Sequence, residues 1–285
     1  MLLSRLGVYL SFVRFSHSVF ALPFALAGAL LASRVVPITW PVVGWILVAM
    51  VAARSAAMGF NRLVDARMDA LNPRTASREI PRGAMSTAEA AVFVAVSAAV
   101  FVFASWRLNT ICFLLSPVAL AIVFWYSLAK RYTTWTQLYL GLAMAVAPVG
   151  GWLAVGGRGG WEPWLLALAI GLWVGGFDVL YACQDVDFDR AHRLHSIPAR
   201  FGIASALRFS RAMHVGAVAC LLALAAVTPL PWFYLAGVGI VALLLAYEQS
   251  LVSAADLSQV KRAFDLNGYV GVLYLIVLAV SIYVR

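Results

Sequence analysis

Residues 41–60 read PVVGWILVAMVAARSAAMGF, an apolar run that contains a single charged residue, Arg54. A helix of about 20 such residues crosses the hydrocarbon core of a bilayer, which is about 30 Å thick. Comparable runs recur along the 285-residue chain, which is 64% hydrophobic and only 12% charged, with a mean hydropathy of +0.91. This composition excludes an ordinary soluble domain. It predicts an all-α, polytopic membrane protein.

Charged residues, prolines and glycines divide the apolar sequence into nine expected transmembrane helices. Between these helices lie only two long polar segments, at about 61–87 and 184–210. The expected spans are 17–36, 41–60, 88–106, 109–128, 135–156, 163–183, 211–229, 232–252 and 266–284.

The basic residues are distributed unevenly over the two sides of this topology. Of the 21 Lys and Arg residues, 16 fall on the side of the amino terminus and of both polar segments, and Arg54 falls inside a span. Only Arg34, Arg107, Arg158 and Arg285 fall on the other side. Cytoplasmic loops carry an excess of Lys and Arg, so the amino terminus and both segments are expected in the cytoplasm. The formal net charge of +9 therefore reflects topology and anionic ligands, and no nucleic-acid partner is expected.

The two polar segments resemble each other. Each begins with two aspartates four residues apart, Asp65 and Asp69 in the first and Asp185 and Asp189 in the second, and each continues to an Ile-Pro pair. Each aspartate pair follows an even number of expected spans. The halves are therefore predicted to be two parallel four-helix repeats plus a final helix, with their sites facing each other at one membrane face.

Helical spacing places the oxygen-bearing side chains of each segment on one face. Asn61, Asp65 and Asp69 are successive residues of an i, i+4, i+8 stripe if the second span continues as a helix past residue 60. Asp185 and Asp189 share a second face, from which Asp187 points away. Two carboxylates four residues apart repel each other on a helix, so a cation is expected between them.

This combination of residues predicts a site for a magnesium diphosphate. Mg²⁺ prefers hard oxygen ligands and is usually held by one or two carboxylates together with substrate phosphates. The guanidinium group of arginine matches a phosphate or carboxylate with two parallel hydrogen bonds. The arginines expected to surround the acids are Arg54, Arg67, Arg74, Arg78, Arg131 and Arg193.

Three motifs resemble the UbiA superfamily of intramembrane aromatic prenyltransferases. They are Asn61-x-x-x-Asp65-x-x-x-Asp69, Tyr181-x-x-Gln184-Asp185-x-x-x-Asp189 and Lys130-Arg131-Tyr132-Thr133. The resemblance covers essentially the whole chain and implies one transmembrane prenyltransferase domain over residues 1–285. It implies that Asn61, Asp65, Asp69, Asp185 and Asp189 hold Mg²⁺ and the diphosphate of a polyprenyl donor. It also implies catalytic roles for Asp65, Asp185 and Arg131, and substrate contacts by the arginines named above, Tyr181 and His195.

Two residues differ from the pattern of the 4-hydroxybenzoate enzymes in that family. Arg62 stands where those enzymes usually have Asp after the Asn, and the first site is therefore expected to be more positive. His195 stands where a Lys is common. The sequence Leu194-His195-Ser196 before Ile-Pro is similar to a subgroup of which some members are thought to serve the futalosine route to menaquinone.

The resemblance implies a magnesium-dependent transfer of a polyprenyl group from polyprenyl diphosphate to a hydroxylated aromatic acid of the 4-hydroxybenzoate type, in quinone biosynthesis. The expected location is the lipid bilayer of a bacterial inner membrane. Alternative acceptors are a dihydroxynaphthoate, in menaquinone synthesis, and haem. An alternative from another class is a membrane transporter of an anionic solute, but transporters bind near the bilayer midplane, whereas these acids lie at one face.

Overall fold

The computed structural model describes residues 7–9, 11–13 and 18–284, and the regular structure within them is entirely helical. Eight of the described helices are long and apolar enough to cross a membrane, and the shorter apolar helix α2 (Ser18–Ala32) adds a ninth. The prediction of a polytopic protein of about nine helices is therefore confirmed. Residue 17 of the first expected span lies outside the described residues, as do three cations of the topology count, Arg5, Arg14 and Arg285.

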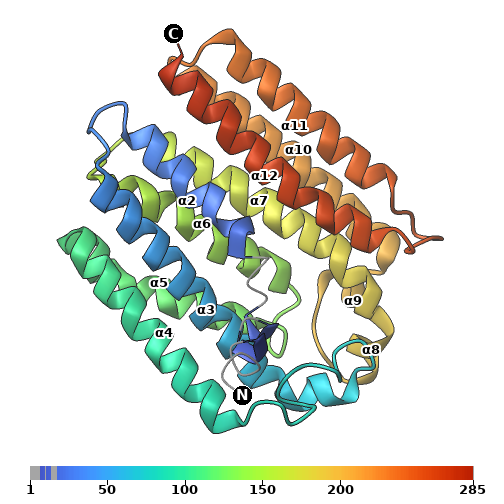
Figure 1. Ribbon diagram of the computed structural model, residues 1–285. Coiled ribbons are helices and arrows are strands. Elements are labelled where there is room, and N and C mark those ends of the chain that lie inside the picture. Colours follow the sequence, from blue (N-terminus) through green and yellow to red (C-terminus); the bar gives the residue numbers. More distant parts are fainter. Residues whose placement is uncertain (1–6, 10, 14–17, 285) are drawn as a thin grey trace.

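The long helices run roughly alongside one another and form one bundle (Figure 1). Their bounds are α3 (Trp40–Leu71), α4 (Thr87–Leu108), α5 (Thr110–Ala129), α6 (Thr136–Val155), α7 (Glu162–Ala182), α10 (Ile203–Val227), α11 (Trp232–Ser250) and α12 (Val260–Tyr283).

Local sequence explains where several of these helices begin. Ser86 caps α4 and forms a reciprocal capping box with Glu89, which satisfies two backbone N–H groups at the helix start. The side chain of Asn109 accepts the backbone N–H of Cys112 and caps α5 with this single hydrogen bond. Prolines occupy the first turn of α3 and of α7, where their missing N–H leaves no hydrogen bond unmade.

Three helices extend well beyond the predicted apolar runs. Helix α3 continues from the expected end at residue 60 to Leu71, while α10 and α12 begin eight and six residues before the expected 211 and 266. The 32 residues of α3 correspond to a length of about 48 Å, so the helix extends well beyond a bilayer core of about 30 Å. Charged residues mark where the hydrocarbon core ends, and the helical hydrogen bonds continue past that point.

The two polar segments are more ordered than the expected loops. The first is helical up to Leu71, as the stripe of Asn61, Asp65 and Asp69 required. The second contains a 3-10 turn, η2 (Cys183–Asp185), and two short helices, α8 (Val186–Ala191) and α9 (Ile197–Phe201). Residues 72–86 of the first segment form turns and bends without a helix, whereas in the second segment only the short connections between the pieces are irregular.

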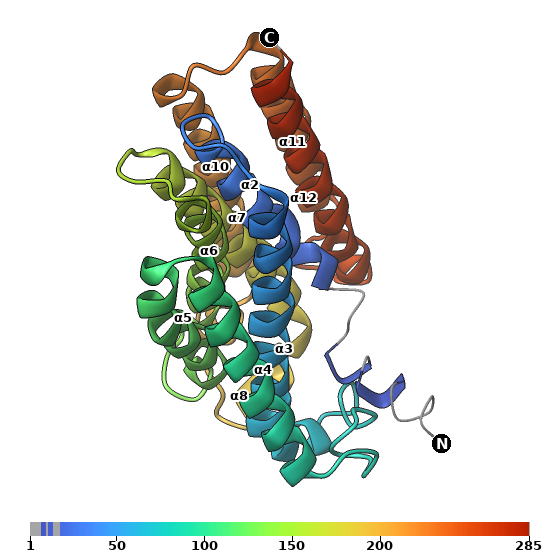
Figure 2. The ribbon, with the colours of Figure 1, turned by 60° about the vertical axis from the view of Figure 1, so that its left-hand side comes forward.

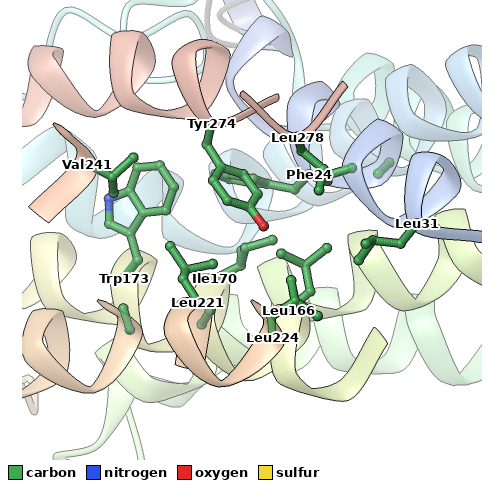
Figure 3. Close-up of a cluster of buried hydrophobic side chains, with 14 of the residues drawn as sticks. Phe24, Leu31, Leu166, Ile170, Trp173, Leu221, Leu224, Val241, Tyr274 and Leu278 are labelled. Atoms are coloured by element: carbon green, nitrogen blue, oxygen red, sulfur yellow. The ribbon is translucent and has the colours of Figure 1, made fainter. Parts of the chain in front are cut away.

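The main core lies between α2, α7, α10, α11 and α12 (Figure 3). Tyr274 and Phe24 are fully buried there, and the ring of Phe24 packs edge-on against Trp173 at 5.4 Å between centroids. Two glycines bring α6 against α2: a Cβ on Gly28 would overlap the carbonyl of Pro148, and one on Gly151 would overlap that of Ala25. Small residues allow this close approach of helices inside a membrane, where van der Waals packing drives association.

Both halves place their polar segment at the same end of the bundle. Helix α3 packs along α4, and α7 packs along α10, so in each half the helix before a polar segment packs against the next long helix after it. The described residues 11–13 also lie at this end, beside the α3–α4 loop (Figure 2). The carboxyl-terminal end of α12 lies at the opposite end (Figure 1).

Candidate active site

The first motif forms one polar stripe on α3. Asn61 donates a hydrogen bond from Nδ2 to Asp65 Oδ2 at 3.0 Å. Asp65 also receives Arg131 Nη2 at 2.9 Å, and the same nitrogen donates to the carbonyl of Val64. One turn further on, Arg78 Nη1 donates to both oxygens of Asp69, at 2.8 and 2.7 Å. The stripe therefore presents amide and carboxylate oxygens that are already matched by two arginines.

The second motif is bound by an arginine of the first segment. Arg74 grips Asp185 through two parallel contacts, Nε to Oδ1 at 3.1 Å and Nη2 to Oδ2 at 2.6 Å. Its Nη1 donates to the hydroxyl of Tyr181 at 3.2 Å, and its guanidinium lies 5.6 Å from the centre of that ring. Burial disfavours the charge of Arg74, but Asp185 more than compensates, so the pKa of Arg74 is raised above its ordinary value.

The last acid of the second motif has a different environment. Asp189 is fully buried, with Lys130 Nζ 2.6 Å from Oδ1 and the hydroxyl of Ser196 donating to Oδ2 at 2.9 Å. The backbone N–H of His195 donates to the carbonyl of Lys130 at 2.8 Å. These contacts fasten the second polar segment to the turn after α5. Sequence reasoning assigned no role to Lys130 or Ser196, although the Lys130-Arg131 pair marked this turn.

Each motif carboxylate is thus paired with its own cation, whereas the sequence predicted one cation between two acids. Within the described residues, no three His, Cys, Asp or Glu side chains gather into a group able to hold a metal by themselves. The cations hold the acids apart in separate pairs, which are Asp65 with Arg131, Asp69 with Arg78, Asp185 with Arg74 and Asp189 with Lys130.

A deeper polar group lies toward the membrane interior. Arg54 is on α3, about two turns before Asn61, and its buried Nε has no hydrogen-bond partner in the described part of the chain. Tyr126 of α5 lies within electrostatic range of Arg54, Asp65 and Asp178, the last of which is on α7. Three helices therefore direct polar side chains into one inner region next to the aspartates.

Three predicted substrate-binding residues, Arg67, Arg193 and His195, are exposed and pair with none of the motif acids in the described structure. Arg67 is exposed, because it lies two helical steps of 100° from Asp65. Arg193 and His195 are exposed on the connection between α8 and α9. Asp187 is exposed too, while Asp185 and Asp189 are buried, which agrees with the prediction that it points away.

The expectation of a more positive first site at Arg62 is wrong. Arg62 is buried and pairs with Glu79, its Nη1 lying 3.0 Å from Oε2. Glu79 thus neutralises the extra charge. The sequence motif alone did not reveal this partner, because the two residues are 17 positions apart across a loop.

The fold and the site define an integral-membrane protein whose acidic and basic side chains alternate at one end of a helical bundle. The UbiA prenyltransferase family model matches residues 21–276. The chain belongs to this family.

Several proteins are similar along most of their length. The 4-hydroxybenzoate octaprenyltransferase of Enterobacter sp. (strain 638) is 32% identical over 228 residues, which covers 80% of this chain and 78% of that one. The enzyme of the same name from Citrobacter koseri is 31% identical, with 83% of each chain covered. The apo structure of a UbiA homolog from Aeropyrum pernix K1 is 37% identical, with a TM-score of 0.85 over 93% of this chain and 98% of that one.

A UbiA homolog from Archaeoglobus fulgidus, solved with GPP and Mg²⁺, shares the fold with a TM-score of 0.72 at 18% identity, over 95% of this chain and 99% of that one.

Proposed function

We propose that this protein transfers a polyprenyl group from a polyprenyl diphosphate to a hydroxylated aromatic acid of the 4-hydroxybenzoate type. The observation that carries this proposal is the set of alternating acids and cations from both halves, which offers ligands for a metal and for a diphosphate in one place. The names of the curated relatives support the aromatic acceptor, and family membership disfavours the transporter hypothesis.

The cations of the site would bind the diphosphate of the donor. Arg74, Arg78 and Arg131 lie between the two motifs and point at carboxylates, and a phosphate oxygen can replace a carboxylate oxygen in the same geometry. Lys130 adds a compact charge beside them. Charge that develops on the leaving diphosphate would thereby be stabilised by groups already in position.

The donor set also fits Mg²⁺. Asn61, Asp65, Asp69 and Asp185 offer only hard oxygen ligands, and no three carboxylates converge within the described residues. Each ion would therefore be held by one or two carboxylates and completed by diphosphate oxygens. When bound, Mg²⁺ would neutralise the leaving group. Asp189 remains a predicted ligand, although Lys130 contacts its Oδ1 and Ser196 donates to its Oδ2.

Arg54 would hold the carboxylate of the aromatic acceptor. It is a buried arginine of the site, and no acid partner for it occurs among the described residues. A buried cation in a membrane is costly unless it meets a partner or a polar cavity. An aromatic acid bound through Arg54 would lie beside Tyr126 and below the diphosphate site, which suits attack of the ring on the donor carbon.

The reaction breaks the allylic C–O bond of the donor and forms a C–C bond to the ring, which then loses a proton. The electron pair of the broken bond leaves with the diphosphate, where Arg74, Arg78 and Arg131 would stabilise it. The surrounding apolar helices would keep water from the cation-like allylic group.

A hydroxynaphthoate acceptor is the second candidate. It is favoured by His195 in Leu194-His195-Ser196 and by Arg62, the two departures from the 4-hydroxybenzoate pattern. Because both acceptors carry a carboxylate, Arg54 would serve either one. In both cases we place the site loops and the amino terminus in the cytoplasm, on the basis of the distribution of Lys and Arg.

The test is an incubation of purified protein with octaprenyl diphosphate and a panel of hydroxybenzoates and hydroxynaphthoates, with Mg²⁺ or with a chelator, followed by mass spectrometry. We expect a magnesium-dependent product whose mass is that of the acceptor plus one prenyl group. The acceptor that gives this product decides between the two candidates. Folded protein that prenylates none of them would overturn the proposal.

A further inference from the structure

A buried ion pair joins α3, close to the first motif, to the loop that follows this helix. Arg62 and Glu79 form it, and their side chains are only 5% and 6% exposed. Burying two charges is costly unless both are paired and hydrogen-bonded. Glu79 meets this condition, because Ser11 also donates to its Oε1 at 2.5 Å.

Glu79 lies in the loop between α3 and α4, close in sequence to two arginines that bind motif acids. Its neighbour Arg78 binds Asp69, and Arg74, five residues earlier, binds Asp185. The carbonyl of Glu79 also accepts the backbone N–H groups of Ala84 and Met85, at 2.9 and 3.1 Å. The ion pair therefore fastens to α3 the part of the loop that presents both arginines.

The amino-terminal segment covers the ion pair from outside. Phe12 and Val13 are buried against Met85 and Ala90, and the ring of Phe12 packs edge-on against Phe93 at 5.7 Å between centroids. With Ser11 bonded to Glu79, this segment closes the pair off from solvent.

We propose that Arg62 and Glu79 form a clamp that positions Arg74 and Arg78 for the donor diphosphate, with Ser11 closing the clamp. This inference rests on the proposed function, because it takes Arg74 and Arg78 as diphosphate ligands. Both arginines are bound to motif acids, and they must leave those acids to bind a diphosphate. The clamp uses none of the motif acids. It therefore holds the loop in place while Arg74 and Arg78 exchange their carboxylates for the diphosphate.

Charge reversal tests the clamp. In Arg62→Glu and Glu79→Arg, like charges meet at the buried contact, and we expect the loop to detach. The KM for octaprenyl diphosphate should rise by about tenfold or more, with smaller changes in kcat and in the KM of the acceptor. Trypsin should cleave the folded protein faster after Arg82, an exposed residue of the same loop. The double variant R62E/E79R restores opposite charges and should return both measurements toward the wild-type values.

Three further variants keep the test decisive. Glu79→Gln preserves the shape and is expected to fold even if the reversals do not, with a smaller shift in the same direction for both measurements. Ser11→Ala should give a weaker effect again. Arg211→Glu reverses an exposed charge on α10 and should change neither measurement.

Cleavage after Arg82 judges the clamp independently of prenyl transfer, so a failure of the proposed function would not hide its result. Unchanged cleavage and donor KM in folded Glu79→Gln, or a lower melting temperature alone, would overturn the inference.

Discussion

Arg74 belongs to the loop after the first motif, yet its guanidinium grips Asp185 of the second motif, with contacts of 3.1 and 2.6 Å. Residues 111 positions apart are thereby joined, and the two halves of the bundle meet at this contact. The same arginine touches Tyr181. A molecule that binds between the halves must therefore compete with, or replace, this bridge.

Asp65 and Asp185 offer the most direct test of the site. Replacing either one with alanine removes a proposed metal ligand, and we expect turnover to fall by about 10³-fold or more. The protein should remain in the membrane with an unchanged elution profile in detergent. The measurement is product formation under saturating donor and acceptor.

Asp187 is the matched control for these two variants, because it lies in the same segment and is exposed. Asp187→Ala should retain most of the activity. An equal loss at Asp187 would contradict the argument from helical faces.

The pairing of each acid with a cation predicts that Mg²⁺ and diphosphate bind together. Mg²⁺ alone must displace an arginine from its carboxylate. Diphosphate alone must displace a carboxylate from its arginine. When both are present, the metal takes the acids while the diphosphate takes the arginines. By linkage, each should then raise the affinity for the other by the same factor, typically about 5- to 150-fold. Calorimetric titration with Mg²⁺ and inorganic pyrophosphate, separately and in combination, measures this coupling. Independent binding of the two would contradict it.

The sequence predicted the bundle and the motif stripes because both depend on local periodicity. Apolar runs indicated the bilayer crossings. The spacing of Asn61, Asp65 and Asp69 predicted a shared face, which α3 confirms. The continuation of helices beyond the bilayer was not visible in hydropathy, since charge ends an apolar run without ending a helix.

The partners of the acids could not be predicted from local patterns. The contacts of Arg74 with Asp185 and of Lys130 with Asp189 link different helices, and they depend on how the bundle packs. For the same reason, Glu79 was not recognised as the residue that neutralises Arg62. Arg67 was predicted to bind phosphate because it is an arginine close to the acids in sequence. Its position on the helix turns it away from those acids.

Glu79 should make the stability of the protein depend on pH. Burial raises its pKa, but the hydrogen bond from Ser11 and the charge of Arg62 outweigh burial, so the pKa of Glu79 in the folded protein is lowered. A carboxyl group with a lowered folded pKa stabilises the fold above its ordinary pKa, and this stabilisation is lost as the pH falls through the folded value. The difference in melting temperature between wild type and Glu79→Gln should therefore be largest near neutral pH and shrink below about pH 4. A difference that stays constant from pH 7 to pH 3 would show that Glu79 is not ionised in the fold.

Arg54 should determine how the acceptor is bound, because it lies deeper than the diphosphate-binding cations and has a buried Nε without a hydrogen-bond partner in the described structure. In Arg54→Ala, the acceptor carboxylate would lose a charge-assisted contact worth about 1.5–3 kcal/mol, and the KM for the aromatic acid should rise by about 10- to 150-fold. Binding of inorganic pyrophosphate with Mg²⁺ should stay near the wild-type value, because Arg74, Arg78 and Arg131 remain. A phenol without a carboxylate supplies the control substrate: its rate should differ little between wild type and variant. If Arg54→Ala instead weakened pyrophosphate binding and left the KM of the acceptor unchanged, Arg54 would belong to the donor site.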